Sequence, residues 1–376
     1  MLDLEVIRGQ LDEIDNEIVT LFEKRMQLCK DVAKFKIETG KQVLDRKREQ
    51  SKLKVLKDQV HGDLNRSGVE DVIKQIMSVS RKLQYQILAE HNMLDAIHFQ
   101  EIDQIKKTDI TVVYQGVSGA YSQSAMFQYF GKQIKHYSVH TWDDAMQEVS
   151  SGRADYAVLP IENSSAGMVG DVCDLLVKYD NTIVDECYLK VEHALMGLQD
   201  ASMEQIQTVY SHPQGFMQCA DYLEAHKEWE TISLNNTALS AQTVLEQNDP
   251  SKAAIASELA AELYGLKVLE HGVNDEKDNT TRFLVIASKK IYRKDAKKLS
   301  ICLEIAHESG ALYQTLSHII YNDLNMTKIE SRPIPDKAWE YRFFIDMEGN
   351  LSDSSVQNAL RGMKEEVMSL KILGNY

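Results

Sequence analysis

The feature that most constrains the fold is a long segment without helix breakers. Between Gly9 and Gly40 there is neither glycine nor proline, and apolar residues recur at alternating spacings of three and four. This heptad pattern comprises Leu4, Ile7, Leu11, Ile14, Ile18, Leu21, Leu28, Val32 and Phe35, and it predicts one long amphipathic helix. About 30 helical residues span roughly 45 Å, whereas a domain of about 100 residues has a radius of gyration of only about 13 Å. Because its own domain cannot bury such a helix, we expect it to pack against a second copy of the chain.

Polar residues share the face of this helix. Arg25 occupies a heptad position between Leu21 and Leu28, and Lys36 lies three turns further along the same face. The helical pattern continues to about residue 100, where further polar residues fall at helical spacings: Asp45, Arg48, Glu49, Ser80 and Gln84. Arg25 either sets the helix register or binds an anion. A buried polar set of this size favours anion binding, because its burial costs free energy unless a polar ligand satisfies it.

Together with Arg8, this set resembles the motif of the all-helical chorismate mutase family over about residues 1–90. The resemblance implies an intertwined dimer in which Arg25, and Arg8 from the partner chain, bind the carboxylates of chorismate. It also implies that Lys36 and Gln84 contact the ether oxygen and Glu49 the ring hydroxyl, while Asp45, Arg48 and Ser80 complete the site. The rearrangement needs no nucleophile and no proton transfer, so catalysis consists of holding the reactive conformer and stabilising charge on the ether oxygen.

From about residue 108 to 288, short β-rich runs alternate with helical stretches, which predicts an α/β sheet. Polar clusters lie at the strand ends, next to helix starts or turns: Ser118 with Ser122, Glu162–Ser165, Ser211 with Gln218, and Thr280–Arg282. Each cluster alone is explained by helix capping. Ligands in open α/β folds bind at the carboxyl ends of the strands, so several such clusters favour one shared cleft.

Four motifs of this region resemble the prephenate dehydratase family: Gly116-x-x-Gly119-x-Tyr121-Ser122, Pro160–Ser164, Ser211–Gln214 with Gln218-Cys219, and Asn279–Phe283. The resemblance implies two α/β lobes, similar to periplasmic-type binding proteins, with a cleft between them. It implies that the Thr281 hydroxyl assists departure of the ring hydroxyl. The expected substrate-positioning residues are Ser122, Glu162, Asn163, Ser164, Ser211 and Gln218. Arg282 pairs either with a substrate carboxylate or with an internal acid such as Asp278, and His212 ranks below Thr281 as an acid.

Residues from about 298 onward predict a compact α+β unit in the order β-α-β-β-α, with room for a last strand, and the basic stretch 288–298 is expected to be the linker into it. The order fits a ferredoxin-like module and resembles an ACT domain. That resemblance implies phenylalanine binding by Gly310, Ala311, Leu312, Glu330, Ser331, Arg332 and Pro333. It also implies feedback inhibition by L-phenylalanine and side-by-side pairing of two modules.

Composition narrows the choice of partners and compartment. The net charge is −15, and all of it lies beyond residue 100. An acidic body argues against nucleic acid or membrane-surface partners. Five scattered cysteines without a Cys-x-x-Cys pair, and the lack of a signal peptide or a long apolar run, predict a cytoplasmic protein with reduced thiols, no metal and no cofactor.

These features predict a multidomain enzyme with an all-α mutase domain at 1–95, a two-lobed α/β dehydratase domain at 108–288 and an α+β ferredoxin-like regulatory domain at 297–376. The expected reactions convert chorismate to prephenate and prephenate to phenylpyruvate, as steps of phenylalanine biosynthesis, in a homodimer or higher homo-oligomer. Three alternatives stay open. The first is a dehydratase that prefers arogenate to prephenate. The second is a non-enzymatic amino-acid-binding protein, and the third is a helical domain that serves only for dimerisation.

Overall fold

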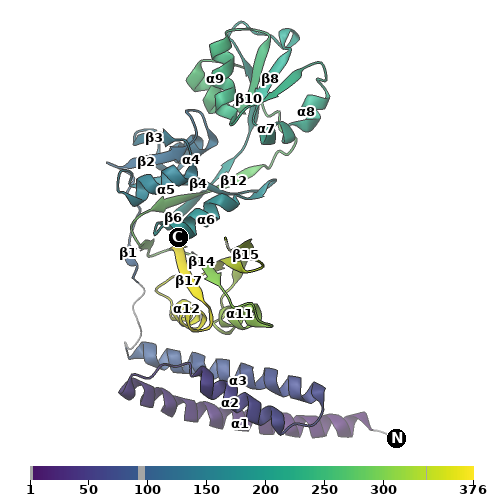
Figure 1. The fold of residues 1–376 in the computed structure, drawn as a ribbon, viewed down its shortest axis with the longest axis vertical. Coiled ribbons are helices and arrows are strands. Elements are labelled where there is room, and N and C mark those ends of the chain that lie inside the picture. Colours follow the sequence, from purple (N-terminus) through teal and green to yellow (C-terminus); the bar gives the residue numbers. More distant parts are fainter. Residues whose placement is uncertain (1–2, 92–97, 336) are drawn as a thin grey trace. The chain divides into compact units, whose positions relative to one another are not determined.

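The computed structural model describes residues 3–91, 98–335 and 337–376, so residues 1, 2 and 92–95 of the predicted mutase domain lie outside the described part. The chain, drawn as a ribbon in Figure 1, divides into two compact units. The first unit comprises Met1–His98 and Ile301–Leu370, and the second comprises Phe99–Ser300 and Lys371–Tyr376. The helical segment and most of the C-terminal module therefore belong to one unit, and the predicted three-domain boundaries stay a prediction.

Three helices build the N-terminal part of the first unit: α1 (Leu4–Thr39), α2 (Arg46–Asp58) and α3 (Asp63–Glu90). This confirms the predicted helical character of the segment. α1 begins after Asp3, whose side chain accepts a hydrogen bond from the Glu5 amide, and it ends at Gly40, which adopts a left-handed φ of 67°. One unbroken helix therefore spans the whole heptad pattern.

The heptad face of α1 stays exposed in the single chain. Ala33, on another face, is the buried residue of α1 and belongs to a small core cluster with Val43, Tyr85 and Leu88. Leu21 in contrast is 65% exposed, and the other exposed heptad residues are Leu4, Leu11, Ile14, Ile18, Leu28, Val32 and Phe35. Soluble monomers rarely expose an apolar stripe of this length, so this face of α1 is a candidate interface with another chain.

The C-terminal module contains β14 (Lys298–Glu304), α11 (Ala311–Tyr321), β15 (Met326–Pro333), β16 (Tyr341–Glu348), α12 (Ser354–Glu366) and β17 (Ser369–Asn375). Its strands lie in the order β15-β16-β14-β17. The element order β-α-β-β-α-β confirms the predicted order, including the last strand. With this strand order the module is ferredoxin-like.

Two sheets organise the second unit, and each is covered by helices (Figure 1). Within this unit the first sheet has the order β17-β6-β12-β4-β2-β3, with Gly374 of β17 opposite Ile183 of β6, and the second has the order β11-β7-β10-β8-β9. The first sheet and its helices comprise β2 (Thr111–Gln115), α4 (Tyr121–Phe130), β3 (Lys135–Val139), α5 (Trp142–Ser150), β4 (Tyr156–Asn163), α6 (Gly170–Lys178), β6 (Thr182–Lys190) and β12 (Thr280–Ala287). The second sheet and its helices comprise β7 (His193–Gly197), β8 (Thr208–Ser211), α7 (Pro213–Met217), α8 (Ala220–Glu224), β9 (Glu230–Ser233), α9 (Thr237–Gln247), β10 (Lys252–Ser257), α10 (Glu258–Tyr264) and β11 (Lys267–Glu270).

The chain crosses between the two sheets twice, after β6 and before β12. β12 pairs antiparallel with both β6 and β4, and its register places Thr281 opposite Asn163. Because the apolar side chains of each sheet are buried among its own helices, the sheets are two separate cores. The polar strand ends at the crossing thus come from two sheets that each have a buried core. This organisation confirms the predicted α/β alternation.

The stretch 288–298 is not only a linker, which corrects the sequence-based expectation. It contains β13 (Ile291–Arg293), which pairs in parallel with β1 (Gln100–Ile102), and it supplies the first residue of β14. Basic residues of this stretch also form ion pairs, such as Arg293 with Asp185 at 2.7 Å.

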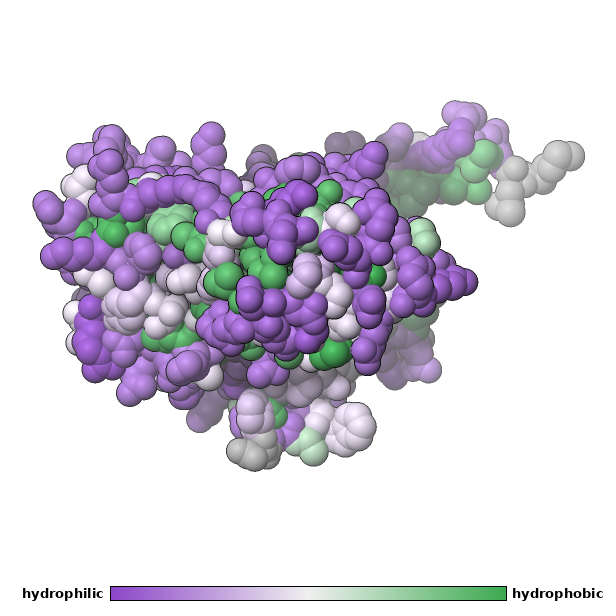
Figure 2. Space-filling model, turned by 90° about the horizontal axis from the view of Figure 1, so that it is seen from above, coloured by the Kyte–Doolittle hydropathy of each residue, from purple (hydrophilic) through white to green (hydrophobic). Residues whose placement is uncertain are grey.

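The surface view in Figure 2 is mostly hydrophilic, with smaller hydrophobic groups between. Within the described residues, no helix is long and apolar enough to cross a membrane. The same residues contain no cluster of three or more His, Cys, Asp or Glu side chains arranged to hold a metal ion.

Candidate active sites

The first candidate site lies between α1 and α3. Arg25 donates a hydrogen bond to the Ile76 carbonyl at 3.3 Å and a shorter one to the Ser80 hydroxyl. Gln84 donates to the Ser80 carbonyl at 3.1 Å, and both Ser80 and Gln84 are buried. The structure therefore brings Arg25, Ser80 and Gln84 together, with a cation and an amide both bonded to Ser80.

Lys36 extends this site toward the α1–α2 loop. Its ammonium group donates to the Val43 carbonyl at 2.6 Å. Partial burial lowers the pKa of Lys36, while the carboxylates of Glu365, Glu49 and Asp45 act in the opposite direction. Lys36 is thus a cation that is partly removed from water and surrounded by several acids.

Glu49 has a partner that the sequence did not reveal. The Arg81 guanidinium, which is buried, donates to both carboxylate oxygens of Glu49 at 2.8 and 2.6 Å. Arg81 also pairs with Glu366 of α12 at 2.9 Å. Its position one residue after the Ser80 motif was the signal that could have identified it.

The remaining residues of the predicted mutase set lie at the edge of this site. Asp45 caps α2 by accepting a hydrogen bond from the Arg48 amide at 3.0 Å, and both side chains are exposed. Arg8 is 61% exposed and pairs with Glu5 at 2.9 Å. It lies 17 residues before Arg25, about 25 Å along the helix, so the single chain does not bring Arg8 to the Arg25 site.

The second candidate site is built on the facing ends of β4 and β12. The Asn163 amide donates to Thr281 Oγ1 at 2.9 Å and to Asn279 Oδ1 at 2.7 Å. Asn163 Oδ1 accepts from the Ser165 and Ala166 amides at 3.0 and 2.9 Å. Asn163 and Thr281 are each 8% exposed, so the Thr281 hydroxyl is largely removed from water and one of its acceptor positions is occupied by Asn163.

Other predicted residues hold this strand entrance in place. Ser164 accepts a hydrogen bond from the Thr280 amide at 3.0 Å through its hydroxyl, and the Ser164 amide donates to the Thr280 carbonyl at 2.9 Å. Ser122 is buried in the first turn of α4. Ser211 is fully buried and donates to the Ile255 carbonyl at 2.8 Å, so its hydroxyl proton already has a partner in the protein.

Gln218 connects the second sheet to this site, through a residue that the sequence analysis missed. Gln218 Nε2 donates to the Ser165 hydroxyl at 3.1 Å, and Gln218 Oε1 lies 2.9 Å from His193 Nε2. His193 Nδ1 lies 2.8 Å from the Tyr121 hydroxyl. The available signal was weak: His193 is a single histidine in the apolar run of β7.

Arg282 points away from Thr281, as alternation along a strand requires. Its guanidinium lies 2.6 Å from Glu186 and 3.7 Å from Glu162, and it donates to the Tyr376 hydroxyl at 2.9 Å. Of the two alternatives for Arg282, the structure favours pairing with internal acids. Glu186 and Glu162 supply these carboxylates, where the sequence offered Asp278 as an example.

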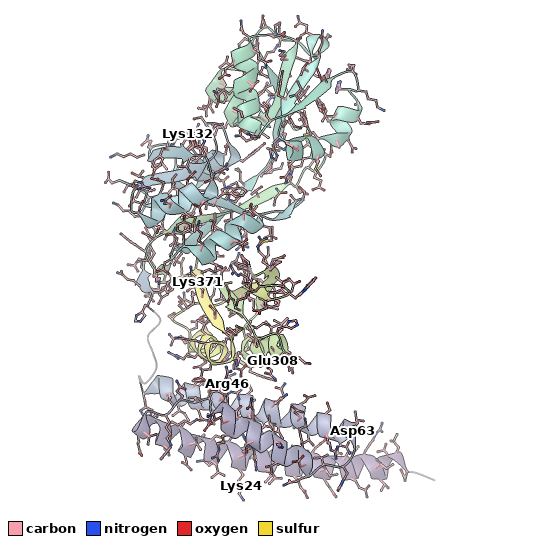
Figure 3. The ribbon with its side chains drawn as sticks, viewed as in Figure 1. Lys24, Arg46, Asp63, Lys132, Glu308 and Lys371 are labelled. Atoms are coloured by element: carbon pink, nitrogen blue, oxygen red, sulfur yellow. The ribbon has the colours of Figure 1, made fainter. Side chains whose placement is uncertain are left out.

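The ferredoxin-like module contains a cavity of about 400 Å³ at the start of α11. Gly310, Ala311 and Leu312 line it together with Tyr341 and Phe343, among others. Glu308, labelled in Figure 3, also lines it. The predicted segment Glu330–Pro333 lies on β15, where Ser331 is paired with Phe343 of β16.

Comparison with known proteins identifies two families in the chain. Residues 7–85 match the family model of chorismate mutase type II, and residues 112–291 match that of prephenate dehydratase. A bifunctional chorismate mutase/prephenate dehydratase of Enterobacter agglomerans is 32% identical, over 99% of this chain and 95% of its own length.

Two solved structures resemble the chain over 71% of its length. A prephenate dehydratase from Arthrobacter aurescens in complex with L-Phe has a TM-score of 0.66 at 28% identity, with 89% of that chain covered. GqqA, described as a novel type of quorum quenching acylase, has a TM-score of 0.64 at 29% identity, with 97% of that chain covered. Since one fold carries both descriptions, the fold alone does not decide the chemistry.

Proposed function

This chain belongs to the family of bifunctional chorismate mutase/prephenate dehydratases, and we propose that it converts chorismate to prephenate and prephenate to phenylpyruvate. The observation that carries this proposal is that each matched segment contains its own assembled polar site. One contains the Arg25 and Gln84 cluster, and the other the Thr281 and Asn163 pair. The match to a bifunctional relative covers both segments, which distinguishes this chain from a protein that shares only the second fold.

For the mutase reaction, the charges in the first site suit a rearrangement without proton transfer. Arg25 would bind a carboxylate, and Lys36 and Gln84 would donate to the ether oxygen as its bond to the ring carbon breaks. Such donors are most effective when they are fixed before the reaction, because no free energy is then spent on reorganising them. The contacts of Gln84 with Ser80 and of Lys36 with Val43 support this preorganisation. Glu49, held by Arg81, would accept from the ring hydroxyl.

For the dehydratase reaction, the bond between the ring and its carboxylate breaks and releases CO₂. The electron pair completes the aromatic ring and expels the ring hydroxyl, which takes a proton to become water. Thr281 would donate a hydrogen bond to that departing oxygen. The contact with Asn163 supports this role, because an acceptor bond at Thr281 Oγ1 leaves the hydroxyl proton free for the substrate. Ser122, Glu162, Ser164, Ser211 and Gln218 are proposed to shape the substrate pocket.

We also propose that two chains associate through the heptad face of α1 and that Arg8 enters the partner's mutase site. The exposed apolar stripe and the distance of Arg8 from Arg25 support both ideas. The five free thiols support a cytoplasmic location.

Feedback control is the last part of the proposal. L-phenylalanine would bind at the cavity beside Gly310, Ala311 and Leu312, and Glu330–Pro333 would complete that site across a pair of modules. Support comes from the ferredoxin-like topology and from the A. aurescens relative, whose structure contains L-Phe. The ligand would inhibit the dehydratase if it binds the inactive state more tightly than the active one.

The direct test supplies the purified full-length protein with chorismate and follows prephenate and phenylpyruvate. Both products should appear in that order, and prephenate alone should give phenylpyruvate. Arogenate tested in parallel should give a lower kcat/KM than prephenate; a higher value would reassign the dehydratase substrate. Millimolar L-phenylalanine should slow phenylpyruvate formation, and unchanged kinetics would refute the sensing role.

A further inference from the structure

A hydrogen-bond network reaches from the second sheet to the candidate catalytic threonine. We define the Thr281 network as Tyr121, His193, Gln218, Ser165, Asn163 and Thr281. Its consecutive contacts measure 2.8, 2.9, 3.1, 2.8 and 2.9 Å. Every link is within hydrogen-bond distance, and the network joins α4 and β7 to β4 and β12.

The direction of this network is fixed at the Asn163 end. Two backbone amides, of Ser165 and Ala166, donate to Asn163 Oδ1. Backbone N–H groups can only donate, so the Asn163 nitrogen must face Thr281. The Ser165 hydroxyl lies 2.8 Å from the same Oδ1 and must donate to it, since two oxygen lone pairs would otherwise face each other.

The hydrogen-bond directions from Ser165 to Tyr121 depend on the orientation of Asn163. Because the Ser165 proton is committed to Asn163, Ser165 Oγ accepts from the Gln218 nitrogen. Gln218 therefore presents its oxygen to His193 Nε2, which must carry a proton. His193 is 2% exposed, and burial lowers its pKa, which favours the neutral ring. Nδ1 of the neutral ring is then an acceptor for the Tyr121 hydroxyl, which also lies 2.9 Å from the Glu192 carbonyl oxygen.

All donors in the network therefore point toward Thr281, and Thr281 Oγ1 receives the last of them. Hydrogen bonds in series polarise one another in a low-dielectric interior, so the Thr281 proton becomes a better donor to a leaving oxygen. The opposite His193 tautomer would face the Gln218 oxygen with a lone pair. It would turn the Gln218 amide and reverse the bond at Ser165.

We propose that His193 is a positioning residue of the dehydratase, whose Nε2–H fixes Gln218 so that the Thr281 hydroxyl is oriented toward the substrate. This inference rests on the proposed function and assigns a role to a residue distant in sequence from the four motifs. It predicts a change in turnover rather than in substrate affinity. Of the residues proposed to contact the substrate, His193 bonds through its side chain to Gln218, and it acts on Thr281 only through that residue.

The test compares His193→Leu, His193→Gln and Tyr121→Phe in the full-length protein. Leucine removes both ring nitrogens, and kcat of the dehydratase should fall about 10- to 100-fold with a much smaller change in KM. Glutamine can restore a donor near the Nε2 position, so it should recover most of kcat. Tyr121→Phe removes the hydroxyl next to Nδ1 but leaves the Nε2 contact with Gln218, so it should give an intermediate loss. His226→Leu, at a histidine stacked on Trp229, is the matched control and should leave kcat unchanged.

Mutase activity and the denaturation midpoint of each variant report on folding. The inference is overturned if His193→Leu keeps wild-type kcat, or if His193→Gln recovers nothing while its midpoint equals that of the wild type. If His193→Leu does not fold, the glutamine and Tyr121→Phe variants decide by the same criterion. A wild-type protein without any dehydratase activity would instead contradict the proposed function itself.

Discussion

At the scale of single residues, the second site depends on one amide that can only be oriented one way. Asn163 donates to Thr281 and Asn279 and accepts from two backbone amides. Asn163→Asp keeps the shape and the acceptor but removes the donor to Thr281. Loss of one oriented donor costs about 100-fold or more in turnover. Steady-state kinetics with prephenate should therefore find a kcat reduced to that extent, and a kcat within a few-fold of wild type would contradict this role of Asn163.

The protonation state of Lys36 should make mutase activity depend on pH. Burial lowers its pKa from the ordinary value of 10.5, so the ammonium group loses its proton at a lower pH than an exposed lysine. Because the cationic form is the one proposed to stabilise the ether oxygen, mutase activity should decline on the alkaline side below pH 10.5. The pH profile of the mutase kcat tests this. Lys36→Arg should move the decline to higher pH, and an identical profile in the variant would exclude Lys36 as the titrating group.

At the scale of elements, the turn between β2 and α4 requires a glycine for two separate reasons. Gly119 has a φ of 88°, and a Cβ there would lie 2.8 Å from the Cα of Ala260. Gly131, at the other end of α4, has a similar φ of 84° but open space around it. Gly131→Ala should cost about 1 kcal/mol of backbone strain, and Gly119→Ala clearly more because Ala260 must also move. Chemical denaturation of both variants measures the difference, and equal losses would refute the packing argument.

Sequence patterns predicted the elements better than they predicted the contacts. The heptad spacing identified α1, and strand alternation identified the sheets and the order of the last module, because both depend on local periodicity. β1 and β13 escaped prediction, since each has only three residues and is defined by its partner across nearly 190 residues of chain.

The residues of the candidate sites likewise divide into those that local motifs predict and those that depend on tertiary contacts. Thr281 and Asn163 belong to recognisable motifs, and their register pairing agrees with the expectation of a shared site. His193 and Arg81 were missed because their roles arise from tertiary contacts with Gln218 and Glu49. The hydrogen bond from the Ser211 hydroxyl to the Ile255 carbonyl was missed for the same reason, and the role of Ser211 in the substrate pocket stays a prediction.

At the scale of the whole molecule, the exposed face of α1 makes association the main prediction. Ile18 and Leu21 are 56% and 65% exposed in the single chain. A charge placed at either position would have to be buried in a dimer, at a cost of several kcal/mol. Ile18→Glu should therefore shift the protein toward monomer in sedimentation experiments and reduce mutase activity by removing the partner's Arg8.

A control is available in the second unit, where Leu245 of α9 is also exposed, at 41%. Leu245→Glu should leave both the sedimentation coefficient and the mutase rate unchanged. A dimer that survives in Ile18→Glu, or a wild-type protein that sediments as a monomer at working concentration, would show that the heptad face has another purpose.

A single variant tests whether the two active sites of this chain work independently of each other. In Thr281→Ala the hydroxyl at the dehydratase site is absent, while the mutase residues lie in the other unit. When this variant is supplied with chorismate, prephenate should form at the wild-type rate and accumulate, with phenylpyruvate formation reduced by orders of magnitude. Phenylpyruvate formed at the wild-type rate, or a failure to make prephenate by a variant with an unchanged denaturation midpoint, would contradict this expectation.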